Sequence, residues 1–311
     1  MNRRNLAFLV PYNRRPLFAL VDHKPTSKRL LAAAGIPVPE TYAELGIQWD
    51  LRRLRELVAP HPDFVIKPAR GSGGGGVQVI VHREGERFIK ASGAALSLRD
   101  LTDHCSEILS GSFSLNQRCD EVVIESRVAV DPVLGRLSYQ GVPDVRIMMF
   151  RGVPVQAMIR LPTRASDGRA NLHMGGMGVG VDLATGRTVH GLLGRRPADL
   201  HPELGVSVVG VTVPQWEEVL AIATRCYGAV PLGYLGVDVV LDAGRGPLVL
   251  ELNARPGLNI QLANRRGLRP MMEELRGRDV EKLSFDERIA LGRVLAAGAL
   301  DRGRGDDVPP P

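Results

Sequence analysis

The sequence predicts an α+β protein, and three observations support this class. Helical and strand-like segments are mixed along the chain, without the regular alternation that a doubly wound parallel sheet requires. Two pairs of strand-like segments are separated by short turn sequences, which is typical of antiparallel hairpins. A run of glycines lies between two further strand-like segments, within residues 63–81.

Composition limits the class of partner. The chain has 311 residues, of which 44% are hydrophobic, so it can bury a sizeable core. Lys and Arg exceed Asp and Glu by six, 40 against 34, which favours anionic small molecules as ligands. Aromatic residues are 5% of the chain and offer few platforms for bases, so we do not expect nucleic acid as a partner.

Apolar runs and cysteine spacing indicate the cellular compartment. We find no apolar run of about 18 residues and therefore predict no membrane span. The three cysteines lie far apart without a CxxC pair, which favours a reduced, cytoplasmic protein.

The first half of the chain should begin with an arm, residues 1–20, rather than a domain. A helix is expected at 26–34, because Thr26 or Ser27 can cap its start and Gly35 ends it. Two more helices are expected in this half, at 51–59 and 98–110.

The second half should contain both hairpins. Strands are expected at 121–128, 145–150 and 153–160, and the last two should join at Arg151-Gly152. An amphipathic helix with proline at its start is expected at 214–227. The segments YLGVDVVLD and PLVLELN should pair around AGRG, and the spacing of Ser284 and Glu287 predicts a capping box for a last helix.

The glycine run, GSGGGG, fits the pattern G-x-G-x-x-G of dinucleotide-binding folds. That motif needs a helix directly after the last glycine, whereas VQVIV is a strand. The unit is therefore strand, glycine loop, strand. Its bare amides can lie over nucleotide phosphates, with Lys67 at the end of the first strand to neutralise charge. The alternative is a surface hairpin with a solvated lysine.

A second group of polar residues lies in VLELNARPG, where Glu251 and Asn253 point to one face of a strand. If the AGRG turn closes Asp242 against Pro247, Asp238 falls opposite Glu251. Carboxylates directly across a ladder repel each other unless a cation lies between them. Oxygen ligands of this kind suit Mg²⁺. The alternative is a solvated edge.

Six segments in order resemble the ATP-grasp superfamily, and in particular the RimK-type α-L-glutamate ligases and their glutamate ligase-related relatives. The resemblance covers roughly residues 22–265. The segments are DHKPTSKRLLAAAGIPVPET with Lys24 and Lys28, VIKPARGSGGGGV, VVIES, DVRIMMFRGVPVQAMIR with Asp144, Arg146 and Arg160, RANLHMGG, and GVDVVLD followed by LELNARPGL.

The resemblance implies an ATP-grasp fold, in which two α+β subdomains enclose ATP. The ATP-grasp domain would span 21–298 with a lid at about 60–124, a disordered tail would follow at 299–311, and the N-terminal pre-ATP-grasp domain would be missing or reduced. The implied reaction is ATP-dependent carboxylate–amine ligation through an acyl phosphate, giving ADP and phosphate. Its cofactor would be Mg²⁺, with Mn²⁺ as an alternative.

The resemblance also implies site residues. ATP would contact Lys28, Lys67, Gly71, Ser72, Gly73, Gly74, Gly75, Gly76 and Glu125. The metal would be held by Asp238, Glu251 and Asn253. Catalytic roles would fall to Arg160, Asn171 and Arg255, and substrate binding to Arg146 and His173. The alternatives are a structural ion pair for Arg146, a loop surface for Arg255 and a structural role for His173.

The match departs from RimK-type enzymes near the substrate. Met174 stands where they have Arg, and Arg255 where they have a small residue, so glutamate need not be the substrate. The expected partners are a small-molecule or peptide carboxylate and an amine acceptor, and a partner protein or a second copy of the chain could complete the acceptor site. Two other functions remain open: a small-molecule kinase on the same scaffold, and a non-catalytic nucleic-acid-binding module.

Overall fold

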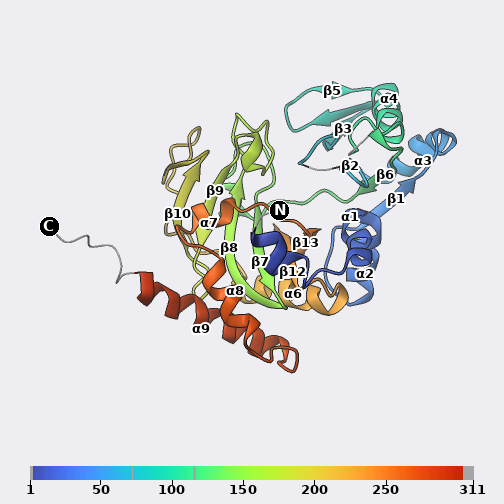
Figure 1. Cartoon of the computed structure of the whole chain (residues 1–311). Coiled ribbons are helices and arrows are strands. Elements are labelled where there is room, and N and C mark those ends of the chain that lie inside the picture. The colour runs from blue at the N-terminus through green and yellow to red at the C-terminus, as the bar shows by residue number, and fades with distance from the viewer. Residues whose placement is uncertain (1–2, 72, 115–116, 304–311) are drawn as a thin grey trace.

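The computed structural model describes residues 3–71, 73–114 and 117–303, and it contains two antiparallel sheets with helices packed on them (Figure 1). The helices, including short 3₁₀ and π turns, are η1 Asn5–Leu9, η2 Arg15–Phe18, α1 Ala19–Asp22, α2 Lys24–Ala33, η3 Gln48–Arg53, α3 Leu54–Val58, α4 Leu98–Leu109, α5 Pro132–Gly135, η5 Leu172–Met174, α6 Trp216–Ala229, α7 Asn259–Ala263, α8 Arg269–Arg276 and α9 Phe285–Gly303.

The strands fall into two groups along the chain. Those of the first half are β1 Thr41–Leu45, β2 Phe64–Pro68, β3 Gln78–Glu84, β4 Arg87–Lys90, β5 Ala95–Leu96 and β6 Val122–Glu125. Those of the second half are β7 Asp144–Phe150, β8 Val153–Leu161, β9 Met177–Val181, β10 Thr188–Leu193, β11 Arg196–Pro197, β12 Tyr234–Asp242 and β13 Gly246–Asn253.

The smaller sheet has six strands in the order β1-β6-β2-β3-β4-β5. Helix α4 covers it, and Leu101 and Ile108 on this helix pack against Phe64 and Ile66 of β2 in a separate apolar core. Ser97 and Asp100 form a capping box at the start of α4, so the predicted helix at 98–110 is confirmed. This unit carries the glycine segment between β2 and β3.

The larger sheet has seven strands in the order β11-β10-β9-β8-β7-β12-β13. Helices α6 and α9 pack on β8, and α7 packs near β9 and β10 (Figure 1). The long apolar runs of β7, β8 and β12 are buried on both faces and form the main core. This sheet is therefore a rigid base for polar residues at its strand ends.

Both predicted hairpins form. Arg151 and Gly152 have φ angles of 51° and 75°, which are the left-handed values that a two-residue turn between β7 and β8 requires. The turn between β12 and β13 closes Asp242 against Gly246, not against Pro247 as predicted. A bulge further along the ladder then restores Asp238 to a position opposite Glu251.

The two ends of the chain are built as follows. The N-terminal segment, expected as an arm rather than a domain, forms η1, η2 and α1, and Phe8 and Leu9 are buried in the main core. At the other end, α9 is capped by Ser284 and Glu287 as predicted and continues to Gly303, and residues 304–311 of the expected tail lie outside the described residues. No helix in the described part of the chain is long and apolar enough to cross a membrane.

Candidate active site

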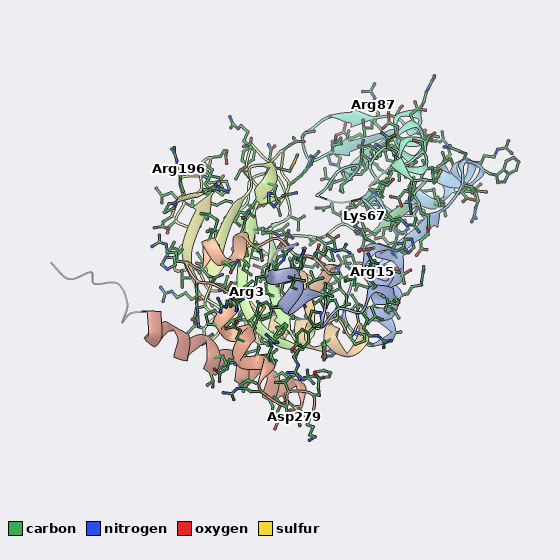
Figure 2. All side chains as sticks on the ribbon, in the orientation of Figure 1. Arg3, Arg15, Lys67, Arg87, Arg196 and Asp279 are labelled. Atoms are coloured by element: carbon green, nitrogen blue, oxygen red, sulfur yellow. The ribbon has the colours of Figure 1, made fainter. Side chains whose placement is uncertain are left out.

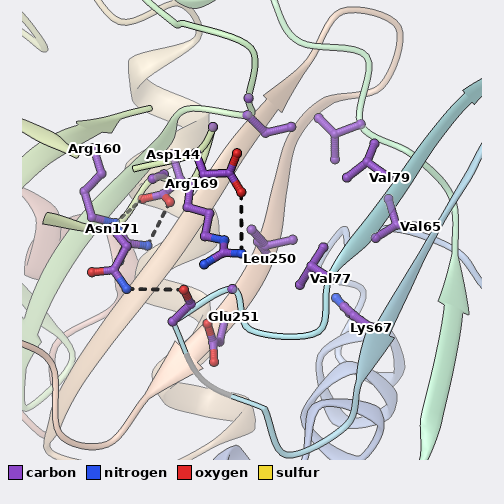
Figure 3. Close-up of a pocket in the computed structure, with 18 of the residues that line it drawn as sticks. Val65, Lys67, Val77, Val79, Asp144, Arg160, Arg169, Asn171, Leu250 and Glu251 are labelled. Atoms are coloured by element: carbon purple, nitrogen blue, oxygen red, sulfur yellow. Dashed lines mark hydrogen bonds and ion pairs between the residues drawn. The ribbon is translucent and has the colours of Figure 1, made fainter. Parts of the chain in front are cut away.

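A cavity of about 800 Å³ lies between the two sheets. One wall comes from β2, β3 and the glycine segment, and the other from β7, β8, β13 and the loop that follows β8. In Figure 3, Val65, Val77 and Val79 lie on the side of the smaller sheet, opposite Leu250. Polar groups fill the other end, so the cavity has an apolar and a charged half.

The glycine segment is held in place at several points. The Lys24 ammonium donates a hydrogen bond to the Gly71 carbonyl. The Asn171 amide donates to the Gly73 carbonyl at 3.3 Å, and a ring nitrogen of His104 lies 2.9 Å from the Gly76 carbonyl. Gly73, Gly74 and Gly76 all have positive φ, where a side chain would be strained. Gly71, Gly73 and Gly76 are therefore each tied by a hydrogen bond to the surrounding structure.

Glu125 is buried between two lysines. Lys67 Nζ lies 2.5 Å from Glu125 Oε1, and Lys28 contacts Oε2 and lies 3.2 Å from Thr41 Oγ1. Burial acts to raise the pKa of Glu125, but the ammonium groups of Lys67 and Lys28 outweigh it and hold that pKa below its ordinary value. The Glu125 carboxylate is therefore charged and committed to the lysines.

Lys24 supplies the cation that we had expected from Lys28. It lines the cavity and its Nζ lies 3.8 Å from Glu251 Oε1, whereas Lys28 does not line the cavity because it is drawn to Glu125. Burial lowers the pKa of Lys24, although Glu251 acts to raise it. Lys24 and Lys28 are four residues apart on α2, so the helical pattern alone could not decide which of them reaches the cavity.

Two arginines meet two aspartates at the base of the cavity. Arg146 binds Asp238 through both carboxylate oxygens, at 2.7 and 2.6 Å. Arg160 binds Asp144 at 2.6 and 2.8 Å and also reaches Asp238 Oδ2 at 2.7 Å. Burial raises the pKa of Asp144 to about 6, while Arg160 acts to lower it. The ion pair that was the alternative reading for Arg146 is thus what the structure shows.

The expected metal ligands divide into two kinds. Glu251 and Asn253 line the cavity and are partly exposed. Asp238 is fully buried, and its oxygens accept hydrogen bonds from Arg146, Arg160 and the Asn253 amide, the last at 3.0 Å. No group of three or more His, Cys, Asp or Glu side chains suited to a metal occurs within the described ranges. Glu251 and the Asn253 amide oxygen are therefore the donors available to a cation.

The other expected residues are placed as follows. Asn171 and His173 line the cavity, as do Gly71, Gly73, Gly74 and Gly75. Gly76 lies at the end of the loop, packed under Phe113. Ser72 lies outside the described residues.

Arg255 is not brought to the cavity. It is exposed beyond the end of β13, and its guanidinium lies 4.4 Å from the centre of the Phe18 ring. The strand has ended two residues earlier, so its alternation no longer sets the direction of this side chain. The predicted catalytic role is not supported by this position.

Arg169 is a further cavity residue that the sequence reasoning missed. Its side chain lies against Gly74, where an added Cβ would meet its Cδ at 3.1 Å (Figure 3). The signal was present in the quoted segment RANLHMGG, in which Arg169 precedes Asn171 by two residues.

Comparisons with solved structures find proteins of low sequence identity. The ATP-grasp ligase PsnB in complex with a minimal precursor is 18% identical with a TM-score of 0.44, covering 86% of this chain and 63% of that chain, so this chain spans less than two thirds of its length. D-cycloserine synthetase DcsG is 17% identical with a TM-score of 0.46, over 85% of this chain and 73% of that one. D-alanine–D-alanine ligase from Bacillus anthracis is 14% identical with a TM-score of 0.45, over 92% and 70%.

The family comparison is the informative one. No curated protein sequence matches the chain. A family model described as "Sugar-transfer associated ATP-grasp" matches residues 3–277, which is most of the chain. The match confirms the predicted ATP-grasp fold with two antiparallel sheets, while a RimK-type specificity stays a prediction. The chain belongs to the sugar-transfer associated ATP-grasp family.

Proposed function

We propose that this chain is an ATP-dependent ligase that joins a carboxylate to an amine through an acyl phosphate. The observation that carries the proposal is the charged half of the cavity. There, Lys24, Lys67 and the glycine loop face Arg160, Glu251 and Asn253 across one space. Cations and bare amides suit a triphosphate, and carboxylate and amide oxygens suit the metal that accompanies it.

The nucleotide would lie with its base in the apolar half and its phosphates in the charged half. Val65, Val79 and Leu250 would contact the base (Figure 3). Lys24 and Lys67 would neutralise the phosphates, while the loop from Gly71 to Gly76 covers them. Because the Glu125 carboxylate is held by Lys67 and Lys28, it would orient Lys67 rather than bind the nucleotide.

Glu251 and Asn253 fit a magnesium ion, because both present oxygen donors beside the lysines. Bound there, the ion would offset the negative charge of the phosphate oxygens. Asp238 would join them only when Arg160 turns from it to the transferring phosphoryl group, since its oxygens are otherwise occupied. Manganese would satisfy the same donors.

The reaction would proceed in two steps. A carboxylate oxygen of the substrate forms a bond to the γ-phosphorus of ATP as the bond to ADP breaks, which gives an acyl phosphate. The amine nitrogen then attacks the carbonyl carbon, phosphate leaves, and the nitrogen loses a proton to give the amide. Phosphorylation is needed because a free carboxylate is a poor electrophile, and the protein contributes positioning and charge.

Residues of β7, β8 and the loop that follows β8 would act on the substrate. Arg160 and Asn171 would stabilise charge on the phosphoryl group, and Arg169, which lies beside Gly74, would do the same. Arg146 would hold Asp238 and Arg160 in place, and His173, which lines the cavity near Gly257, would contact the substrate. Arg255 is left without a role in the chemistry.

The family description makes sugar-borne groups reasonable substrates beside amino acids and peptides. A partner protein or a second copy of the chain would complete the acceptor site, and we place the enzyme in the cytoplasm.

The test is a screen for ADP formation with amino acids, uronic acids and other carboxylates, each with and without amines that include amino sugars. Lys67→Ala and Glu251→Ala should abolish the stimulated turnover. Glu86→Ala, a change on the surface of the smaller sheet, should leave it unchanged.

Phosphate release separates the ligase from the alternative kinase. A ligase releases phosphate when the amine is present, whereas a kinase leaves it on the product. If Lys67→Ala and Glu251→Ala retained full ATP turnover, the site would be wrongly assigned.

A further inference from the structure

The N-terminal segment carries an exposed surface that the proposed chemistry does not use. Between residues 3 and 21 the chain has four arginines and no acidic residue. On its outer side lie Arg3, Leu6, Val10, Pro11, Arg14 and Arg15, all of which are exposed. We call these six residues the N-terminal face.

The apolar members of this face are held outward by the packing beneath them. Phe8 and Tyr12 pack edge-on against Phe150, at 5.9 and 4.8 Å between ring centres. Leu6 and Val10 are four residues apart and remain 58% and 59% exposed. Because the segment is anchored on its inner side, these two side chains cannot fold back into the core.

Arginines from other elements extend the positive charge. Arg276 of α8 lies 5.8 Å from the Phe8 ring and Arg255 lies 4.4 Å from the Phe18 ring, and both are exposed. Glu273 is an acid in the same area, and it pairs with both Arg3, at 3.3 Å, and Arg269, at 2.8 Å. The arginines around the N-terminal segment therefore outnumber this acid.

We propose that the N-terminal face docks on an anionic lipid surface. Exposed aliphatic side chains bracketed by arginines suit a bilayer, because the apolar tips enter the headgroup boundary while the guanidinium groups bind lipid phosphates. A nucleic acid would use the arginines but would gain little from Leu6 and Val10. Arg3 and Arg15 of this face are labelled in Figure 2.

The N-terminal segment is hydrogen-bonded to a turn that borders the cavity. Arg4 donates to the Pro256 carbonyl at 3.4 Å, and Asn13 donates to the Ala254 carbonyl at 3.4 Å. These carbonyls belong to the turn between Asn253 and Gly257, two residues that line the cavity. Docking would therefore bring the cavity close to the lipid headgroups.

The experiment is sedimentation of the full chain with vesicles of phosphatidylcholine alone and with vesicles that also contain phosphatidylglycerol. We expect binding to the anionic vesicles that falls as salt is added. The triple variant Arg3→Gln, Arg14→Gln, Arg15→Gln should bind on the order of a hundredfold more weakly, from about 1 kcal/mol for each arginine. The double variant Leu6→Ser, Val10→Ser should also lose affinity.

A matched control removes the same charge elsewhere: Arg53→Gln, Arg87→Gln, Arg99→Gln, three exposed positions on the smaller sheet and its helices. This control should keep the wild-type affinity, and thermal melting would verify that each variant is folded. The proposal is overturned if the wild type does not bind anionic vesicles, or if the control loses as much affinity as the first triple variant. It is equally overturned if Leu6→Ser, Val10→Ser binds as wild type and duplex DNA competes with the vesicles.

Discussion

Lys67 and Glu125 form a buried ion pair of 2.5 Å that joins β2 to β6 at the edge of the cavity. Their side chains are 6% and 4% exposed, and Lys28 contacts the same carboxylate from α2. One acid thus fixes two cations from elements far apart in the sequence, and the geometry of the cavity wall depends on it.

Glu125→Gln should therefore destabilise the protein strongly. The substitution keeps the shape of the side chain but leaves two buried ammonium groups without a counter-charge, which costs about 3–5 kcal/mol when a buried pair is broken. Urea denaturation at neutral pH would measure the loss. Glu86→Gln is the control, because Glu86 pairs with Arg55 at the surface, where both side chains are more than 60% exposed, and should change the stability by less than about 1 kcal/mol. Equal losses in the two variants would contradict the prediction.

Lys28 should make the free energy of unfolding depend on pH in the alkaline range. Burial lowers the pKa of Lys28 from 10.5 to about 8, although Glu125 acts to raise it. Between these pH values the unfolded chain keeps a proton on this lysine that the folded chain has released. The free energy of unfolding therefore rises with pH across this window, by about 3 kcal/mol from this group.

Comparison of the wild type with Lys28→Met isolates this effect, because groups that do not contact Lys28 titrate alike in both. Burial raises the pKa of the Cys105 thiol to about 12, for example, which acts in the opposite direction above its ordinary value of 9.0 in both proteins. The wild type should gain stability relative to Lys28→Met between neutral pH and pH 10.5. Parallel pH profiles of the two proteins would show that the Lys28 pKa is not lowered.

The sequence was sufficient to predict helices, strands and hairpins. It was less useful for predicting which groups the long side chains contact. The hairpin of β12 and β13 was predicted from alternation, and Asp238 does lie opposite Glu251. The assumed turn was one residue wrong, and a bulge compensates for it. Bulges depend on how the strand packs, so a count along two strands could not have found this one.

The partners of the arginines and lysines could not be predicted from the sequence either. Arg146, Arg160 and Lys24 were visible in the quoted segments, but their partners are Asp238, Asp144 and Glu251, which come from other strands. A long flexible side chain reaches whichever charge the tertiary fold supplies, so pairing could not be predicted from spacing. Arg255 lies away from the cavity lining for the related reason that it follows the end of a strand.

Gly76→Ala should destabilise the protein by more than the strain of a positive φ angle alone. Gly76 has a φ of +72°, and an added Cβ would lie 2.7 Å from the Phe113 ring. Gly85→Ala is a close control, because its φ is +59° and its Cβ would meet nothing within 4 Å. Both variants carry the strain of a left-handed alanine, roughly 1 kcal/mol, and Gly76→Ala should lose about 1–3 kcal/mol more from overpacking. We also expect weaker binding of a non-hydrolysable ATP analogue, by calorimetry, in Gly76→Ala alone. Matching results for both glycines would mean that Phe113 yields freely.

Glu251→Gln should remove the dependence of nucleotide affinity on magnesium. Glu251 is a charged oxygen donor that lines the cavity, and the amide of Gln is a much weaker ligand for this ion. Binding of the non-hydrolysable analogue, measured with magnesium and with EDTA, should be tighter with magnesium in the wild type and equal under both conditions in the variant. Lys67→Met should weaken binding in both conditions, because it removes a phosphate contact rather than a metal ligand.

Glu44→Gln is the matched control, since the Glu44 side chain has the same 34% exposure and pairs with Arg29 at the surface. A Glu251→Gln protein that still gains affinity from magnesium would show that the ion is held elsewhere.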